Sequence, residues 1–193
     1  KKDILVHVHP TSRWLFKEWN DKSMAEIIDY LQIKKKTKVI VTASPEKKEF
    51  DKAKKILELC KSNPLELLGK TSLKQLSALS KRAALFFGVD SAPMHIAAAV
   101  DTPVIALFGP SGAFHWGPWD NNYSLEFGVR SSELKNPYSR KNGTQTFGKH
   151  TVIQKDWDCV PCGKDGCKGS KISDCLLDIG VGEVTDIIGK YLK

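Results

Sequence analysis

Residues 84–109 read ALFFGVDSAPMHIAAAVDTPVIALFG, and this stretch decides the fold. Two short apolar runs, ALFFGV and PVIALFG, have the length and composition of buried β-strands, and APMHIAAAV between them is typical of a short helix. A strand, a helix and a second strand in succession predict a parallel pair joined by a crossover. Asp90 and Ser91 stand at the break, and His95 follows one turn into the helix. Taken singly, His95 is typical of a packed structural histidine.

The same alternation runs through the rest of the chain. Apolar strand patterns and amphipathic helix patterns follow one another, and Ser72 is placed to cap one of the helices. The predicted strands are 4–9, 38–43, 65–68, 84–89 and 103–109, and the predicted helices are 21–32, 46–61, 72–83, 92–100 and 183–193. Strands flanked by helices predict an α/β fold with a doubly wound, Rossmann-like parallel sheet covered on both faces. One such domain accounts for residues 1–193.

The composition is that of a globular protein with an excess of positive charge. Of the 193 residues, 41% are hydrophobic and 27% are charged, and no apolar run is long enough to span a bilayer. The formal net charge of +8 indicates an anionic partner, such as nucleic acid, an acidic membrane surface or a phosphorylated small molecule. Most lysines follow helical spacing and are expected on solvated helix faces. No run interleaves aromatics with arginines, which argues against a nucleic-acid partner.

Polar or glycine-containing turns follow the predicted strands. In chain order they read HPTSR, TASPE, GKTS, DSAPMH and GPSG. Because the carboxyl ends of parallel strands meet at one edge of the sheet, these turns are expected to form a single extended crevice. Ligands of doubly wound folds bind at this edge, so the crevice is the predicted functional site.

The residues of this crevice fit a diphosphate. Asp90 and Ser91 precede a helix whose first N–H groups and dipole favour an anion, although Asp90 taken alone is more typical of a helix cap. Thr11, Ser12 and Lys17 add hydroxyl donors and a positive charge from the first turn. Neither GxGxxG nor GxxxxGK[ST] occurs, so hydride transfer and P-loop nucleotide hydrolysis are not indicated.

Four of the five cysteines lie close together, with the spacing C-x2-C-x4-C-x7-C in a glycine-containing loop. They are Cys159, Cys162, Cys167 and Cys175, in residues 159–175. Thiolates at this density suit a structural zinc ion, and a disulfide or a reduced thiol cluster fits the same spacing. Cys60 stands alone at the end of a helical pattern and is expected to be a small buried hydrophobe.

Residues 131–150 interrupt the alternation of strands and helices. They are polar, basic and glycine-bearing, which predicts a long mobile loop that approaches an anionic acceptor or a membrane surface, or a plain solvated insertion. Trp116 and Trp119 lie just upstream. They would either form the floor of a sugar-binding site or pack against the sheet.

The stretch GVDSAPMHIAAAVDTPVIALFGPS, residues 88–111, resembles the signature of the bacterial lipopolysaccharide heptosyltransferases of glycosyltransferase family 9. The segments HPTSRWLFKEW and HWGPW are most similar to the branch of that family called heptosyltransferase III. The resemblance runs from Ile4 to the final helix. It implies a GT-B enzyme of two Rossmann-like domains, in which this chain is the C-terminal, donor-binding domain. An N-terminal domain, absent from these residues, would hold the acceptor and the catalytic base.

The resemblance also implies roles for individual residues. The implied donor contacts are Thr11, Ser12 and Lys17 to the diphosphate, Asp90 to the sugar hydroxyls, Ser91, Ala92 and His95 to the phosphates and sugar, Thr71 to the adenine, and Glu49 to the ribose. Lys17 would also stabilise the charge on the leaving ADP. Glu46 takes the place of Glu49 if the alignment shifts by one gap, and Glu49 taken alone reads as an exposed helix acid.

The implied reaction moves a heptose, with inversion, from ADP-L-glycero-D-manno-heptose to the inner core of lipopolysaccharide. It requires no metal or other cofactor and belongs in the cytoplasm, at or near the cytoplasmic face of the inner membrane. A domain without the base is expected to show no turnover alone. Three alternatives stand beside this one: a non-catalytic nucleotide-sugar-binding module, a related GT-B enzyme with another donor, and a zinc ribbon with a basic nucleic-acid-binding surface.

Overall fold

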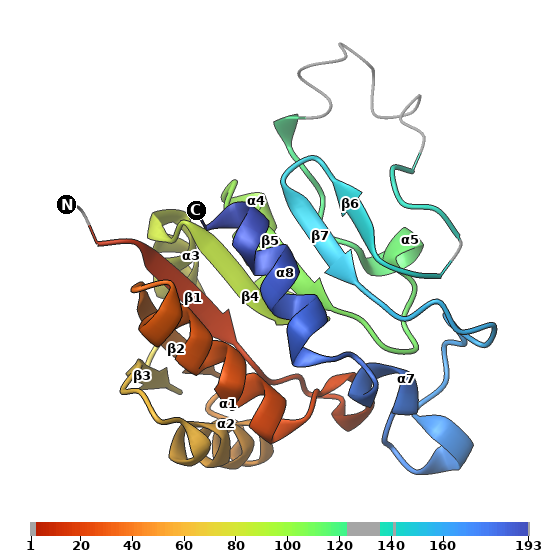
Figure 1. Ribbon diagram of the computed structural model, residues 1–193, viewed down its shortest axis with the longest axis horizontal. Coiled ribbons are helices and arrows are strands. Elements are labelled where there is room, and N and C mark those ends of the chain that lie inside the picture. Colours follow the sequence, from red (N-terminus) through yellow and green to blue (C-terminus); the bar gives the residue numbers. More distant parts are fainter. Residues whose placement is uncertain (1–2, 123–135, 141, 193) are drawn as a thin grey trace.

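A seven-stranded sheet runs through the molecule in the order β3-β2-β1-β4-β5-β7-β6 (Figure 1). The computed structural model describes residues 3–122, 136–140 and 142–192. The strands are β1 (Leu5–His9), β2 (Lys38–Ala43), β3 (Leu65–Leu68), β4 (Leu85–Val89), β5 (Val104–Leu107), β6 (Gln145–Phe147) and β7 (His150–Ile153). Neighbouring strands are parallel, except that β6 runs antiparallel to β7. The strand order reverses between β1 and β4, so the predicted doubly wound α/β fold is confirmed.

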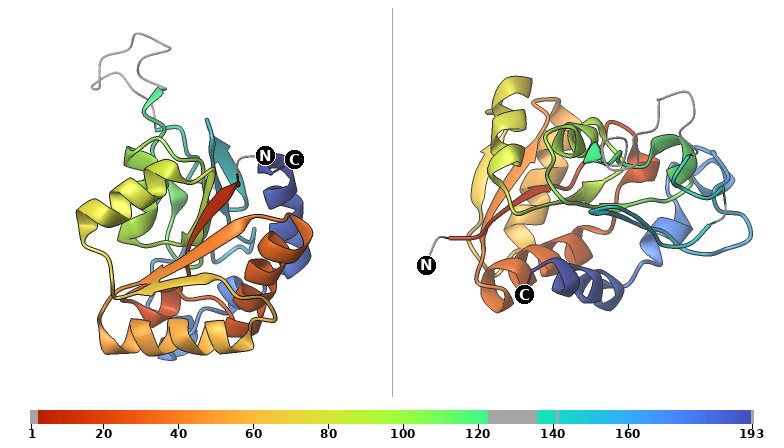
Figure 2. Two further views of the ribbon diagram at one scale, coloured as in Figure 1. Left: turned by 90° about the vertical axis from the view of Figure 1, so that its left-hand side faces the viewer. Right: turned by 90° about the horizontal axis from the view of Figure 1, so that it is seen from above.

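Helices cover both faces of this sheet, and Figure 2 shows α3 and α4 on the side opposite α1 and α8. The helices are α1 (Asp21–Asp29), α2 (Lys47–Leu59), α3 (Leu73–Arg82), α4 (Ala92–Ala99), α5 (Ala113–Trp116), α7 (Asp174–Leu177) and α8 (Val181–Tyr191). Short 3-10 turns lie at Leu15–Lys17 and Cys167–Gly169, and a π-helical turn, Tyr30–Lys34, continues α1. Among the described residues, none of the helices combines the length and apolar character needed to cross a lipid bilayer.

The continuous apolar run of β4 follows from this two-sided cover. All five of its residues are buried. Leu85 and Phe87 belong to the core shared with α1, α2 and α8, whereas Phe86 belongs to the core shared with α4. Successive side chains of a strand point to opposite faces, so a strand covered on both sides needs apolar residues at every position.

The helix termini form where the sequence supplies capping side chains. Ser72 accepts from the N–H of Gln75 in a capping box at the start of α3, as predicted. The side chain of Asn20 accepts from the first N–H groups of α1, which satisfies donors that the helix leaves free. The predicted final helix, 183–193, is observed as α8 and begins slightly earlier.

The predicted mobile loop over residues 131–150 is wrong for its second half. Residues 131–135 and 141 lie outside the described residues. β6 and the start of β7 fall within the predicted range and form a hairpin at the sheet edge, with β7 parallel to β5. The hydroxyls of Thr146 and Thr151 lie 2.9 Å apart across this hairpin. Polar residues here form strands because the edge of β5 supplies hydrogen-bond partners, a tertiary effect that local composition does not reveal.

Gly88 allows β4 to lie close to the end of β1. A Cβ added there would sit 2.5 Å from the carbonyl oxygen of His9. We expect Gly88→Ala to lower the free energy of unfolding by about 2 to 3 kcal/mol, because a backbone atom has to move. Urea unfolding of both proteins measures this change. Gly189→Ala, on α8 where an added Cβ meets nothing within 4 Å, is the matched control and should not destabilise.

Candidate functional site

A cavity of about 520 Å³ lies where the strand order reverses, beyond the carboxyl ends of β1, β2 and β4. We call it the switch-point cavity. It is lined by His9, Ser12, Arg13, Trp14, Lys17, Ala43, Ser44, Pro45, Glu49, Thr71, Leu73, Leu76, Asp90, Ser91, Ala92, Pro93, His95 and Trp116. Its volume is typical of small-molecule sites. The turn after β5, residues 110–112, lines an adjoining cavity, so the predicted crevice is two neighbouring cavities.

The structure gathers the predicted donor contacts around the switch-point cavity, apart from Thr11. Those that line it are Ser12, Lys17, Glu49, Thr71, Asp90, Ser91, Ala92 and His95. Thr11 is fully buried, and its hydroxyl donates to Glu49 Oε2 over 3.2 Å. Thr11 therefore supports the cavity through Glu49 and does not line it.

An ion pair joins the turns after β1 and β4. Lys17 Nζ lies 2.6 Å from Asp90 Oδ2, and the two side chains are only 16% and 4% exposed. Lys17 reaches this position because residues 15–17 form a tight 3-10 turn. A charge pair shielded from water interacts strongly, so an anionic ligand here would find a fixed ammonium group with further donors available.

The start of α4 forms another wall of the cavity. Ser91 is the N-cap residue, and Asp90 uses its carboxylate to pair with Lys17, so Asp90 is not the cap of this helix. The Ser91 hydroxyl donates to the carbonyl of Val89 (3.2 Å). The first N–H groups of α4 and its dipole therefore border the cavity beside Lys17, a combination that favours phosphate.

His95 lines the cavity one turn into α4, where its side chain is exposed to solvent and partly surrounded by the cavity wall. Burial lowers its pKa below the usual value, although the nearby carboxylate of Asp90 opposes this effect. The ring is therefore neutral at pH 7, and it presents one donor and one acceptor nitrogen.

The two acids at the start of α2 differ in their placement. Glu49 is 8% exposed and lines the cavity, and burial raises its pKa. Glu46 is exposed and caps α2 by accepting from the N–H groups of Lys48 (3.0 Å) and Glu49 (3.4 Å). Glu49 is thus the acid that faces the cavity, and it is not an exposed helix acid.

A chain of buried hydrogen bonds leads from the cavity wall into the sheet. Thr42 Oγ1 lies 2.9 Å from His9 Nδ1 and 2.7 Å from His7 Nε2, and His7 Nδ1 lies 2.9 Å from Ser80 Oγ. Burial lowers the pKa of His7 to about 3 and that of His9 to about 4, so both rings are neutral. The chain fixes the orientation of His9, which lines the cavity. Sequence reasoning missed this role, for which the HVH alternation of β1 was the signal.

Glu18 is a second residue that sequence reasoning missed. Its carboxylate accepts from the backbone N–H of Ser12 (3.4 Å) and lies 3.7 Å from Lys52 Nζ. Burial raises the pKa of Glu18 to about 7, and the positive charge of Lys52 opposes the rise. Glu18 therefore ties the turn after β1 to α2. No local pattern marks it, since an acid beside Lys17 reads as a surface residue.

The four clustered cysteines are free thiols. Cys159 and Cys162 are exposed, Cys167 is half-buried and Cys175 is buried. Burial raises the pKa of the Cys175 thiol to about 11, and the three neighbouring sulfurs add to the rise. Within residues 3–122, 136–140 and 142–192, no group of three or more His, Cys, Asp or Glu side chains is arranged to hold a metal ion.

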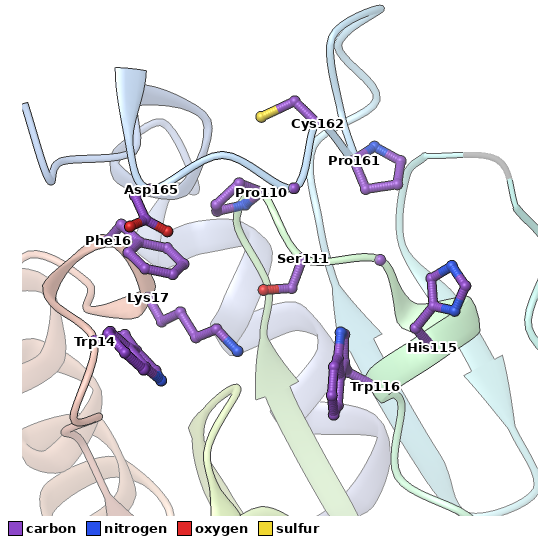
Figure 3. Close-up of a pocket in the computed structure, with 12 residues that line it drawn as sticks. Trp14, Phe16, Lys17, Pro110, Ser111, His115, Trp116, Pro161, Cys162 and Asp165 are labelled. Atoms are coloured by element: carbon purple, nitrogen blue, oxygen red, sulfur yellow. The ribbon is translucent and has the colours of Figure 1, made fainter. Parts of the chain in front are cut away.

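The adjoining cavity, which we call the tryptophan cavity, also has a volume of about 520 Å³ (Figure 3). Trp14, Lys17 and Trp116 line both cavities. The far wall is the cysteine loop, which contributes residues 161–163 and Asp165. Lys17 therefore stands at the junction of two compartments.

Comparison with known proteins agrees with this geometry. The sequence model of glycosyltransferase family 9 (heptosyltransferase) matches residues 1–143. Lipopolysaccharide heptosyltransferase 3 of Escherichia coli (strain K12) is 43% identical over 122 residues, which are 63% of this chain and 35% of that protein. This chain thus spans about a third of the length of that relative.

Solved structures share the fold. E. coli ADP-heptose lps heptosyltransferase II aligns with a TM-score of 0.70 at 21% identity, over 99% of this chain and 47% of its own. E. coli heptosyltransferase WaaC with ADP aligns with a TM-score of 0.63 at 19% identity, over 98% of this chain and 44% of its own. The family match covers most of the residues that build the two cavities, and so the chain belongs to glycosyltransferase family 9, the heptosyltransferases.

Proposed function

We propose that this chain binds ADP-L-glycero-D-manno-heptose and forms the donor-binding, C-terminal domain of an inverting heptosyltransferase of the lipopolysaccharide inner core. The observation that carries the proposal is the Lys17–Asp90 pair at the start of α4, inside a cavity that Glu49 and Thr71 also line. The names of the curated relatives support heptose transfer to lipopolysaccharide, and the solved WaaC structure contains ADP.

Each lining residue has a part in this proposal. Lys17, Ser12 and the N–H groups around Ser91 and Ala92 hold the diphosphate, because they combine positive charge with hydrogen-bond donors. Asp90 accepts from the sugar hydroxyls, and neutral His95 bonds to the phosphates or the sugar. Glu49 binds the ribose and is positioned by Thr11, while Thr71 lies against the adenine.

The chemistry follows from an oxygen attacking the anomeric carbon. An acceptor hydroxyl forms the new C–O bond as the bond to the β-phosphate oxygen breaks on the opposite face, which inverts the configuration. A carboxylate takes the hydroxyl proton, and we assign that base to the partner domain of the enzyme. Negative charge grows on the departing ADP, where Lys17 and the α4 N–H groups stabilise it without a metal. This chain alone is expected to bind donor and not to turn over.

The proposal also covers the cellular location of the protein and its acceptor. A positively charged chain of net charge +8 suits an anionic acceptor that is embedded in a membrane. We place the enzyme in the cytoplasm, in peripheral contact with the inner membrane, with the lipopolysaccharide core as its acceptor. A structural zinc ion at the cysteine loop stays a prediction.

Calorimetric titration of the chain with ADP, UDP, GDP and ADP-heptose tests the proposal. We expect ADP to bind at least about tenfold more tightly than UDP or GDP. A polar group of the site that hydrogen-bonds to adenine would be left without a partner beside uracil or guanine, which weakens binding. Thr71→Val, which keeps the side-chain shape and removes the hydroxyl, should reduce that preference. Equal affinity for all nucleotides would contradict the proposal, and a preference for UDP would assign a different donor.

A further inference from the structure

A line of four side chains joins α3 to the switch-point cavity. In order they are Ser80, His7, Thr42 and His9, and the successive polar atoms lie 2.9, 2.7 and 2.9 Å apart. The first three are fully buried, so water does not reach them. His9 is 4% exposed and lines the cavity, and its Nδ1 is the nitrogen that contacts Thr42. Nε2 is therefore the ring nitrogen that His9 has available for a ligand.

The hydrogen bonds of this line can run in either of two directions. A hydroxyl group has one proton, and a neutral imidazole has one donor nitrogen and one acceptor nitrogen. Burial lowers the pKa of His7 to about 3 and that of His9 to about 4, so neither ring carries a second proton at pH 7. A side chain that accepts from one neighbour therefore has to donate to the other. The direction at one end of the line is transmitted to the other end.

Ser80 decides between the two directions. If Ser80 donates to His7 Nδ1, the Nε2–H of His7 donates to Thr42. Thr42 then donates to His9 Nδ1, and every proton inside the line has an acceptor. In the reverse direction the hydroxyl proton of Ser80 has no acceptor among the described residues, and if Thr42 accepts from both histidines its own proton has none. A fully buried hydroxyl proton without an acceptor is strongly disfavoured, so the first direction holds.

This direction gives His9 a defined role at the cavity. Because its Nδ1 accepts from Thr42, the ring proton is on Nε2, and His9 offers the cavity a hydrogen-bond donor. His9 is the last residue of β1 and pairs in register with Gly88 of β4, two residues before Asp90. These two strands flank the point where the strand order reverses, which is where doubly wound folds bind their ligands. A nucleotide there offers acceptor atoms on its phosphates, ribose and base.

We infer that His9 binds the nucleotide part of the donor through a hydrogen bond from its Nε2–H, and that Ser80 is a positioning residue that fixes the direction of this proton. The inference rests on the proposed function, because that function places a nucleotide in the switch-point cavity. The accepting atom belongs either to the diphosphate or to the adenosine. The hydrogen bond is the same in both cases, and titration with two ligands separates them.

Nitrogen-15 NMR of the histidine rings in the ligand-free, 193-residue chain tests the direction of the line. We expect the His9 ring, identified by the loss of its signals in His9→Asn, to carry its proton on Nε2. Ser80→Ala should give His9 the averaged signals of two tautomers, because either direction then leaves His7 Nδ1 without a partner. Thr37→Val removes another buried hydroxyl, which donates to the carbonyl of Leu31 (2.9 Å). This matched control should leave the His9 tautomer unchanged.

Titration with ADP and with saturating adenosine tests the contact itself. His9→Asn keeps an acceptor oxygen for Thr42 and lacks the Nε2–H, so it should bind ADP about threefold to tenfold more weakly than the parent. ADP should shift the Nε2 signal of His9 in the parent. The same shift with adenosine assigns the accepting atom to the adenosine, and a shift with ADP alone assigns it to the diphosphate.

Two results would overturn the inference and leave the proposed function standing. One is a His9 ring that carries its proton on Nδ1 in the parent chain. The other is parental ADP affinity in a folded His9→Asn variant, with thermal unfolding as the check on folding. A parent chain that fails to bind ADP overturns the proposed function and the inference with it.

Discussion

Replacing Lys17 with alanine is expected to weaken ADP binding about 30- to 150-fold, since a shielded, charge-assisted contact contributes about 2 to 3 kcal/mol. The substitution removes the ammonium group and also leaves the Asp90 carboxylate, 4% exposed, unpaired beside the phosphates. Titration calorimetry measures the change. Lys22→Ala, which removes an exposed lysine of α1, is the charge-matched control and should bind ADP like the parent.

We expect Asp90→Ala to weaken binding of the sugar part of the donor and not of the nucleotide part. Without the carboxylate, Lys17 keeps all of its charge for phosphate, so ADP affinity stays equal or rises. Affinity for ADP-heptose should fall about tenfold, because an acceptor for sugar hydroxyls is lost. The double variant should lose less ADP affinity than Lys17→Ala alone, because the repelling carboxylate is gone too. Parental affinities in both single variants would rule out this pair as the anchor of the donor.

Acid should destabilise the protein steeply below pH 6.5. His7 has its pKa lowered to about 3, and His9 and His150 to about 4, in each case mainly because burial disfavours the charged ring. A lowered pKa means that the unfolded chain binds protons first, so the stability these residues contribute is complete above pH 6.5 and is lost as the pH falls toward 4. Glu18, with its pKa raised to about 7, acts in the opposite direction and offsets part of the loss.

The net effect between pH 7 and pH 5 is a fall of about 1 to 2 kcal/mol in the free energy of unfolding per pH unit, because Glu18 and Glu49, whose pKa values are raised, offset part of the histidine effect. Urea unfolding between pH 7 and pH 5 measures it. His150→Leu sharpens the test, because the ring of His150 is fully buried and its burial lowers the pKa to about 4. The variant should be at least as stable as the parent at pH 7 and clearly more stable at pH 5.

His115 provides the matched control for this titration. It is exposed, so His115→Gln should leave the pH dependence unchanged. A flat stability profile from pH 7 to pH 5 in the parent would mean that the buried histidines take up protons in the folded state. That result would contradict the neutral His9–Thr42–His7–Ser80 chain.

The sequence was most informative where local pattern and burial coincide. The predicted strands 38–43 and 65–68 match β2 and β3 in full. The predicted strand 84–89 contains β4, all of whose residues are buried, because a strand covered on both sides must be apolar throughout. The hairpin β6–β7 was missed because its threonines and glutamine are polar and its stability comes from pairing with β5. Local composition carries no information about a partner far away in the chain.

The sequence likewise predicted the location of the candidate site but not the contacts within it. Glycines, hydroxyls and charges at successive strand ends were enough to place Ser12, Lys17, Asp90 and Ser91 at one edge of the sheet. Contacts between these side chains were not predictable, because they depend on rotamers and distances set by packing. Glu18 reads as a surface acid in the sequence, and only burial beside Lys52 reveals its position under the turn.

By itself, then, the sequence determined the α/β class, the sheet edge that carries the site and the family to which the chain belongs. The tertiary structure alone decided that Lys17 pairs with Asp90, that Thr11 supports Glu49 from behind, and that the cysteine loop closes a second cavity between two tryptophans. The reason is physical: hydrophobic periodicity and turn chemistry act over a few residues, whereas ion pairs and cavity walls join side chains that meet only after the sheet has formed.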